Sequence, residues 1–525
     1  MKKLFCLILL FSPVQVFCQI TFQKTFGGTN AEFFWSLQPT DGGYILVGNT
    51  SSFGQGDIYL IKTNDYGDTI WTKTFGGSLS EYGLSVYPTN DGGYIISGGT
   101  YSSGAGNSDG YLVKTDSSGN FIWSKTYGNL YNEDINIVRP TFDGGYILLG
   151  SSSSFGTSTT DFDIYLIKTD SNGDTIWTKT FGGTGSDNAL YLQQAKDSGY
   201  VITGYTNSFG AGQDDVFLLK TDTNGNLLFL KTYGGVDGDA GSSVQQTKDG
   251  GYIISGKTHS FGAFSNDGDV YLIKTDSIGD VAWTKTFGGA GTDWGHSVQQ
   301  TSDDGFVIAG ETWSFGAGQN DVYVLKTDSN GNLLWSKTFG GSSFDHGRSV
   351  HQTNDAGFII ACNSSSFGMG NFDLYLIKTD PVGSSGCNES NAATITTTPA
   401  AQTTIPAANV SATNTILSVP AILIGNGCIT SSLCGNVGMN EWIASNPFLI
   451  YPNPFSEVTT LKTDIFLNDA TLRVYNSLGQ TVKQINNISG QTITLHRENL
   501  PGGLYSIQLI QDNKIITTNK LLISK

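Results

Sequence analysis

The stretch WTKTFGG, residues 283–289, decides the fold of this chain because the same pattern returns along most of its length. A shortened first copy, ITFQKTFGG at residues 20–28, has Phe22 where most later copies have Trp. The lysines of successive copies are 49 residues apart between Lys24 and Lys73 and 54 apart between Lys125 and Lys179. A period of this length is typical of the blades of a β-propeller. The other copies occupy residues 71–77, 123–128, 177–183, 229–235 and 335–341.

Each repeat unit is expected to form four short strands, as the copy that follows Gly235 illustrates. Strands are predicted at residues 242–247, 251–258, 269–276 and 281–287, joined by two tight Asp-Gly turns and one longer Gly-rich loop. Four antiparallel strands connected in this way make one blade. The first tight turn of each unit begins at Asp41, Asp91, Asp143, Asp197, Asp249, Asp303 or Asp355.

The two ends of the repeat region complement each other. The seventh unit stops after Lys378-Thr379-Asp380 and lacks its fourth, WxKTF-type strand. Residues 20–26 are predicted to form a strand of this type that precedes the first unit. Pairing the two removes a sheet edge that would otherwise invite aggregation. The sequence therefore predicts an all-β fold, with a seven-bladed β-propeller of four-stranded blades over residues 20–380, closed by the N-terminal strand.

The phrase TDSIGDVAW, residues 275–283, resembles the blade repeat of quinoprotein-like propellers. The resemblance implies that the Trp of each repeat docks neighbouring blades. Enzymes of that family have eight blades and adjacent cysteines that form a disulfide over the quinone. This chain has seven units and no adjacent cysteines, so no quinone or other cofactor is expected.

Composition and the N-terminus indicate an exported protein. The net charge of −17 over 525 residues argues against nucleic acid and against anionic membrane surfaces as partners. Residues 1–18 combine two lysines, an apolar run and a small-residue cleavage pattern, which predicts a secretory signal peptide. A lipid-anchored Cys18 is the alternative. No later stretch is long and apolar enough to predict a membrane span.

Four cysteines remain after signal cleavage. A bridge from Cys387 to Cys428 or to Cys434 would close a loop of roughly 40 residues, for which chain entropy suggests about 4 kcal/mol of stabilisation. Cys362 lies in a predicted strand and is expected to be a small buried residue.

Three acidic positions recur once per repeat. The first set, which begins with Asp41, lies in the tight turns. We interpret these residues as structural, because an Asp side chain can hydrogen-bond to the backbone of its own turn. The second set precedes the third strand and is expected to accept backbone N–H groups of the preceding loop: Asp57, Asp109, Asp163, Asp215, Asp269, Asp321 and Asp373. The third set is expected to ring one face, either capping loop amides or attracting cations: Glu32, Glu81, Glu133, Asp187, Asp239, Asp293 and Asp345.

No metal site is expected. The series Asp170, Asn172 and Asp174 has the spacing that begins a calcium loop, but the bidentate Glu is missing, so a hairpin turn is favoured.

The chain beyond the repeats divides into two parts. Residues 381–446 are interpreted as a linker rich in Thr, Ala and Ser; residues 390–440 carry no charge, and loosely paired strands are the alternative. The motifs YPNPF (451–455), LRVYNSLGQ (472–480), LPGGLYSIQL (500–509) and KLLISK (520–525) resemble the type A C-terminal sorting domain of type IX secretion in Bacteroidetes. The resemblance implies that residues 447–525 form a small β-sandwich. It also implies that the translocon reads this sandwich and a sortase removes it, so that the protein reaches the cell surface or the medium.

No catalytic motif stands in the structural context that its chemistry needs. GNSDG (106–110) fits GxSxG but precedes a predicted strand, and GYIISGKT (251–258) fits the phosphate-loop pattern but is itself a predicted strand. HExxH and paired-cysteine metal spacing do not occur. We therefore expect a non-enzymatic secreted or surface protein that binds a glycan or a protein. The alternatives are a polysaccharide hydrolase, which would need two suitably spaced carboxylates from the acidic set, and a passive structural or adhesive module.

Strand direction places a candidate binding surface on the face that carries the long loops. Long loops carry recognition more often than tight turns do, and aromatic and Arg side chains are the usual energetic anchors of binding. The loops entering the sixth, seventh and first units hold more such side chains than the loops of the other units. We predict one binding sector, with gap filling between loops as the alternative reading. Its residues are Phe33, Trp35, His259, Trp294, His296, Trp313, His346 and Arg348.

Overall fold

The computed structural model describes residues 20–523 apart from 106, 156–160, 263, 265–266, 400–401, 405–408, 412–421, 426–428, 435–447, 452–455, 477–479 and 512–513. The predicted signal peptide lies outside the described residues. Every regular element in the described part is a β-strand, and this part holds no helix that could span a membrane. The chain divides into two compact units, Met1–Asn436 and Val437–Lys525, which we call the ring unit and the C-terminal unit.

The ring unit repeats a meander of four strands. The first and innermost strands are β2 (Glu32–Thr40), β6 (Glu81–Pro88), β10 (Glu133–Pro140), β14 (Asp187–Gln194), β18 (Asp239–Gln246), β22 (Asp293–Gln300) and β26 (Asp345–Gln352). The second strands are β3 (Gly43–Thr50), β7 (Tyr94–Thr100), β11 (Tyr146–Ser152), β15 (Tyr200–Thr206), β19 (Tyr252–Thr258), β23 (Phe306–Thr312) and β27 (Phe358–Ser364).

The outer half of each meander consists of two further strands. The third strands are β4 (Asp57–Thr63), β8 (Asp109–Thr115), β12 (Asp163–Thr169), β16 (Asp215–Thr221), β20 (Asp269–Thr275), β24 (Asp321–Thr327) and β28 (Asp373–Thr379). The fourth strands carry the WxKTF pattern: β5 (Thr69–Gly76), β9 (Phe121–Tyr127), β13 (Thr175–Gly182), β17 (Leu227–Gly234), β21 (Val281–Gly288), β25 (Leu333–Phe339) and, from the N-terminus, β1 (Phe22–Gly27).

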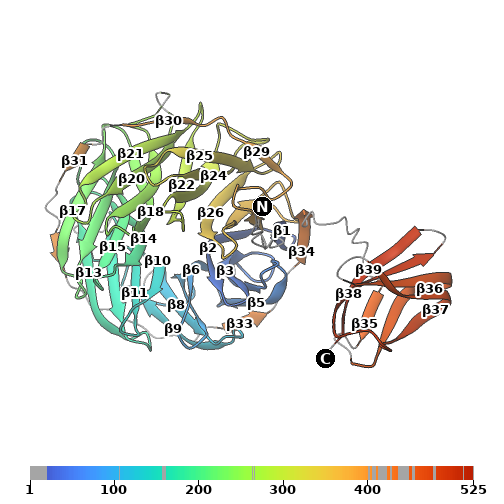
Figure 1. Ribbon diagram of the computed structural model, residues 1–525. Helices are drawn as coiled ribbons and strands as arrows, with labels where there is room; N and C mark the ends of the chain where they lie inside the picture. Colours follow the sequence, from blue (N-terminus) through green and yellow to red (C-terminus); the bar gives the residue numbers. More distant parts are fainter. Residues whose placement is uncertain are drawn as a thin grey trace, which may run out of the picture. The chain divides into compact units, whose positions relative to one another are not determined.

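The meanders form antiparallel sheets arranged in a ring around a central space, as expected for a β-propeller (Figure 1). Strand order runs from the first strand inside to the fourth strand outside, for example β2-β3-β4-β5. Strand β1 pairs with β28, with Phe22 opposite Lys378, as the sequence predicts. Strand β2 also contacts β26, β27 and β28, so the first and last sheets of the ring pack against each other.

The tight turns hold their form through the repeated Asp. Oδ1 of Asp91 accepts the N–H of Gly93 at 3.0 Å, and Gly92 has the left-handed φ of +81° that glycine tolerates. The Lys that ends the third strand forms an ion pair with the same Asp. Six such pairs occur in the described residues: Lys114–Asp91, Lys168–Asp143, Lys220–Asp197, Lys274–Asp249, Lys326–Asp303 and Lys378–Asp355.

Neighbouring sheets dock through the aromatic ring of the WxKTF strand. The rings of Trp71 and Tyr94, on adjacent sheets, have centroids 5.9 Å apart, and Trp283 lies 6.0 Å from Phe306 in the same way. A Cβ on Gly119 would come within 2.7 Å of the Trp71 ring, so the second turn of each unit needs glycine here. The repeat residues therefore fix the packing between sheets.

The described part of the segment predicted as a linker contains short paired strands, which was the alternative interpretation of its sequence. These short strands pair with the outermost strands β25, β21, β17, β13, β5 and β1 in that order, so this segment runs back along the outside of the ring against the chain direction. We call it the outer belt. Its strands are β29 (Glu389–Asn391), β30 (Ile395–Thr397), β31 (Gln402–Thr404), β32 (Asn409–Ser411), β33 (Ile422–Gly425) and β34 (Ile429–Cys434).

The belt forms because the outer strands otherwise present unpaired backbone groups. Uncharged Thr-rich segments can satisfy these groups without burying charge. Cys387, just before β29, is disulfide-bonded, whereas Cys362 is free and buried.

The C-terminal unit has an antiparallel sheet and its own apolar core. Leu461, Leu472, Ile493, Tyr505 and Leu521 are among the residues of this core. The strands are β35 (Phe448–Tyr451), β36 (Val458–Tyr475), β37 (Thr481–His496), β38 (Gly503–Gln511) and β39 (Lys514–Ile523).

Candidate binding site

The acidic residues of the predicted ring are buried and act as caps. Glu32 accepts the N–H of Gly28 at 2.8 Å, and Asp293 accepts that of Gly289 at 2.9 Å. Asp293 also accepts the hydroxyl of Ser314 at 2.6 Å. The same backbone contact occurs at the other five positions, Glu81, Glu133, Asp187, Asp239 and Asp345.

The second acidic set lies beside the first. Asp321 accepts the N–H of Ala317 at 2.8 Å, and Asp373 accepts that of Met369 at 2.8 Å. A Cβ on Gly27 would collide with Asp373 and lie 2.8 Å from Glu32, so the GG pair of the repeat makes room for two carboxylates. Burial raises the pKa of Asp373 to about 6, and the nearby charge of Glu32 adds to this. These contacts are structural.

A β-bulge in each innermost strand builds the central cavity. The pairing with the second strand shifts register at the same place in every sheet, for example between Gly295 and Ser297. A bulge leaves one extra residue unpaired and re-aims its side chain. All seven extra residues line one cavity: Trp35, Leu84, Asn136, Leu190, Ser242, His296 and Arg348.

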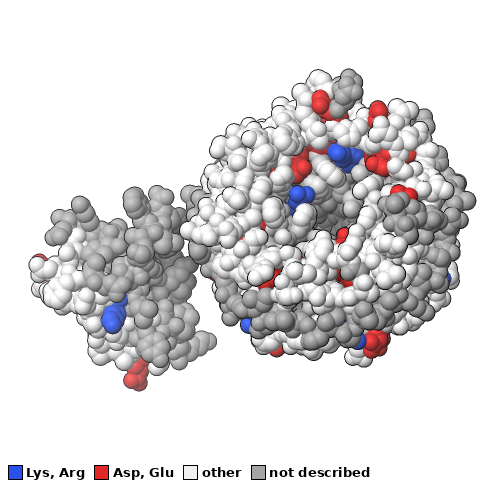
Figure 2. Space-filling view, turned by 180° about the vertical axis from the view of Figure 1, so that it is seen from behind, with Lys and Arg blue, Asp and Glu red and all other residues white. Residues whose placement is uncertain are grey.

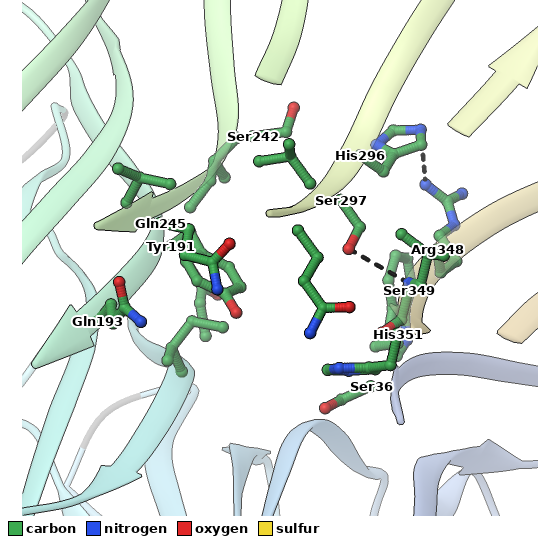
Figure 3. A pocket seen from close by; sticks show the side chains of 18 of the residues that line it. Ser36, Tyr191, Gln193, Ser242, Gln245, His296, Ser297, Arg348, Ser349 and His351 are labelled. Atoms are coloured by element: carbon green, nitrogen blue, oxygen red, sulfur yellow. Dashed lines mark hydrogen bonds between the residues drawn. The ribbon is translucent and has the colours of Figure 1, made fainter. Parts of the chain in front are cut away.

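This cavity, which we call the channel pocket, has a volume of about 330 Å³. Further along the strands it is lined by Tyr191, Gln193, Gln245 and His351, which surround the same space (Figure 3). Several of these amides tie adjacent inner strands together; Gln193, for example, accepts the N–H of Gln246 at 2.7 Å.

Three predicted site residues meet at one side of the channel pocket. The Arg348 guanidinium lies 5.0 Å from the Trp35 ring and donates to Nε2 of His296 at 3.2 Å (Figure 3). Burial, with the charge of Arg348, lowers the pKa of His296 to about 4, so this imidazole is neutral and accepts the bond. The indole of Trp294 lies 4.7 Å from the His296 ring and donates to Ser242 at 2.7 Å.

Glu311 on β23 joins His346 to this group. Its carboxylate accepts a hydrogen bond from Nδ1 of His346, and its Oε2 lies 3.6 Å from Nε2 of His296. Although burial raises the pKa of Glu311, the nearby His296 ring and the hydrogen bond with His346 hold it well below its usual range. Glu311 is therefore a carboxylate enclosed by imidazoles.

Aromatic rings extend the cluster outward. His346 stacks near Phe344 and Phe372, Phe33 lies 5.0 Å from Phe372, and Trp313 lies 5.9 Å from Phe344. The Trp313 side chain is half exposed, at 50%.

A second cavity of about 520 Å³, the rim pocket, takes the remaining predicted residue. Tyr205, Asp214, Lys257, His259 and Trp294 are among its lining residues, and Nζ of Lys257 lies 4.4 Å from the Trp294 ring. Five of the eight predicted sector residues line these cavities, namely Trp35, His296 and Arg348 in the channel pocket and His259 and Trp294 in the rim pocket. Phe33, Trp313 and His346 are not among the lining residues of either cavity.

The other side of the ring is built differently at the same positions. Leu84, Asn136 and Leu190 replace the Trp, His and Arg side chains there, and Tyr82 donates to Asp134 of the next sheet.

Sequence reasoning missed Glu311, Lys257 and Arg139. The Arg139 guanidinium lies 5.2 Å from the centre of the Tyr87 ring and 5.1 Å from that of the Tyr191 ring. Glu311 and Lys257 occupy one variable position of the second strand, opposite Trp294 and Ala240. Comparing the repeats for positions that vary would have found them.

Among the described residues, no group of three His, Cys, Asp or Glu side chains could hold a metal ion.

Comparison with known proteins identifies the C-terminal unit. Residues 449–524 match the secretion system C-terminal sorting domain family, so the chain ends in a sorting domain that directs export to the cell surface or the medium.

Other matches are more distant. The regulatory protein FlaEY of Caulobacter vibrioides is 27% identical over 188 aligned residues, and the match covers 31% of this chain and 20% of FlaEY. The chain thus spans about a fifth of that relative's length. Two solved structures share 10% identity. PorZ, a surface component of the type-IX secretion system of Porphyromonas gingivalis, aligns with a TM-score of 0.38 over 95% of this chain and 60% of PorZ. Sqt1 of Chaetomium thermophilum aligns with a TM-score of 0.39 over 64% of this chain and 81% of Sqt1.

Proposed function

We propose that this is a secreted or cell-surface protein without enzymatic activity, which binds a glycan or a protein on the loop face of its ring unit. In this proposal the ring unit is a seven-bladed propeller closed by β1. The C-terminal unit is a small sandwich that passes the chain to the type IX machinery and is then removed by its sortase. The sorting domain at 449–524 supports the export step.

One observation carries the binding function. The fold supplies seven equivalent bulge positions, and their residues would be alike if they served only the scaffold. Instead Trp35, His296 and Arg348 occupy adjacent sheets, next to the half-exposed Trp313 and the Lys257–Trp294 pair. Aromatic and Arg side chains in a pocket are the usual anchors of binding.

The two other functions have less support. A glycosidase needs an acid and a base or nucleophile that face one cavity. The carboxylates that recur in the repeats, such as Glu32, are instead buried and accept hydrogen bonds from backbone N–H groups. A passive module would need neither the channel pocket nor the rim pocket.

The proposal is tested with the mature full chain on a glycan array and against purified surface proteins of the producing cell. We expect Trp294→Ala and Trp313→Ala to weaken binding of the selected ligand at least fivefold while the melting temperature changes little. Tyr82→Ala is the matched control, because Tyr82 occupies the position of Trp294 on the opposite side of the ring. Losses of affinity that follow the melting temperature would instead make these rings part of the core.

A further inference from the structure

The channel pocket holds two cationic side chains in a strongly acidic protein. Its lining includes Arg139 and Arg348, and none of the residues that line it is Asp or Glu. The chain as a whole carries 45 acidic and 28 basic residues, so a lining without a carboxylate is a local departure. Lys and Arg side chains lie at the edge of the central hollow of the ring unit, and Asp and Glu side chains also lie around this hollow (Figure 2).

Neither arginine forms a direct ion pair with a carboxylate among the described residues. Arg139 is 8% exposed and donates to Ser85 and to the carbonyl of Val138, at 3.1 and 2.7 Å, which are neutral acceptors. Arg348 donates to neutral His296, and its Nε is buried without a hydrogen-bond partner. Glu311 acts on Arg348 only through space, because its carboxylate is engaged by the histidines.

A buried guanidinium cannot lose its proton, so it is costly unless an anion pairs with it. A ligand oxyanion would offset this cost, and the lining holds no carboxylate that would compete with it for the guanidinium groups. The planar fork of Arg favours bidentate binding of a carboxylate.

The rest of the lining favours a sugar. Serine hydroxyls and amides surround the cavity and offer donors and acceptors, while the 39% exposed indole of Trp35 offers a flat apolar face. A sugar ring has hydroxyls around its edge and apolar C–H groups on its faces. The volume of about 330 Å³ lies at the lower end of the range for ligand pockets.

We propose that the channel pocket binds a saccharide residue bearing a carboxylate, which Arg348 holds through its guanidinium while Trp35 stacks on the sugar. This inference rests on the proposed binding function and names the ligand class of the same site.

The experiment uses three oligosaccharides of equal length on the mature full chain. They differ only at C6, which is a carboxylate in uronic acid units, a methyl ester or a neutral hydroxymethyl group. We expect the acid to bind at least tenfold more tightly than the other two, and added salt to weaken only the acid. A sulfated oligosaccharide and a short peptide with a free C-terminus test other sources of an oxyanion.

Variants assign the contact to a residue. Arg348→Gln should reduce affinity for the acid at least tenfold and bring it to the level of the ester, while Arg348→Lys should lose less. Lys73→Gln removes the same charge from the outer strand β5 and should leave binding unchanged. Should Arg348→Gln fold poorly, the comparison of acid with ester on the unaltered chain still decides.

The outcomes separate this inference from the proposed function. If acid, ester and neutral sugar bind equally well and binding depends on Trp294 and Trp313, the inference of a carboxylate ligand is wrong. The proposed binding function would then still stand. Preference for the sulfated sugar or the peptide would overturn the carboxylated saccharide in the same way. Full affinity in a folded Arg348→Gln variant would show that Arg348 does not bind the carboxylate. Failure of every saccharide would overturn the inference, and failure of every glycan and surface protein would overturn the function itself.

Discussion

At the scale of single residues, the ring unit keeps many carboxylates inside the protein by giving each one backbone donors. The arrangement has a cost, because two such groups lie side by side at each junction between sheets. Asp321 shows both effects: it accepts two backbone N–H groups, at 2.8 and 3.3 Å, yet burial, with the charge of Asp345, raises its pKa to about 6.

The raised pKa predicts how Asp321→Asn depends on pH. An Asp with a raised folded pKa binds its proton more tightly in the fold, so its contribution to stability falls as pH rises from about 4 to about 6. Asn carries no charge and does not titrate. We expect the variant to be less destabilised relative to the natural chain at pH 7.5 than at pH 4.5, by up to roughly 2 kcal/mol, because about 1.5 pKa units of the shift lie above pH 4.5. Urea unfolding at the two pH values measures the difference.

Asp91→Asn is the control, because the pKa of Asp91 is shifted in the opposite direction. Although burial raises the pKa of Asp91, the bonds from Lys114, Thr89 and Gly93 lower it to about 2. Its contribution is therefore present above pH 4 and lost as pH falls toward 2, so this variant should be most destabilised at neutral pH. The same pH trend in both variants would contradict the assigned causes.

At the scale of elements, the ring unit joins distant parts of the chain in its last sheet. Strand β1 lies between β28 and β34, so the start, the end of the repeats and the end of the outer belt meet there. Gln23 strengthens the junction, since it donates to Ser385 at 2.7 Å and accepts from Tyr375 at 2.6 Å.

Deleting residues 20–26 should therefore destabilise the whole ring unit. The deletion leaves the edges of β28 and β34 unpaired and removes buried Phe22 and Phe26 from the core. We expect a fall of more than 10 °C in the ring-unit melting temperature, since losing two buried aromatic side chains costs about 3–5 kcal/mol each. Calorimetry measures it, and deletion of residues 437–525 is the control. A ring that melts at the same temperature after both deletions would argue against closure by β1.

The elements that could be predicted are those with local signals. Asp-Gly turns, alternation and the WxKTF pattern fix the four strands of each meander and the pairing of β1. The belt has no such signal: short uncharged strands such as β30 are defined by the edges they meet, not by their own pattern. The bulges at Trp35, His296 and Arg348 depend on pairing register, which spacing alone does not reveal. The binding sector itself stays a prediction from loop composition.

At the scale of the whole molecule, the chain joins a unit proposed to bind ligand to a unit that directs export. The sorting domain has a core of its own, including Leu472 and Leu509, and clusters as a separate compact unit. A unit with its own core can fold, be recognised and be removed without disturbing the other. Export and binding should therefore be separable by truncation.

Truncation in a host with type IX secretion tests this separation. Without residues 449–524 the chain keeps its predicted signal peptide and its ring unit but loses the sorting domain, so we expect it to cross the inner membrane and accumulate in the periplasm. Cell fractionation and immunoblotting of surface, medium and periplasm measure the distribution. Trp294→Ala in the full chain is the control, because a defect in binding should leave export unchanged. The periplasmic product should melt as the natural ring unit does, which separates failed sorting from misfolding. A truncated chain that still reaches the surface would show that a signal outside residues 449–524 directs its export.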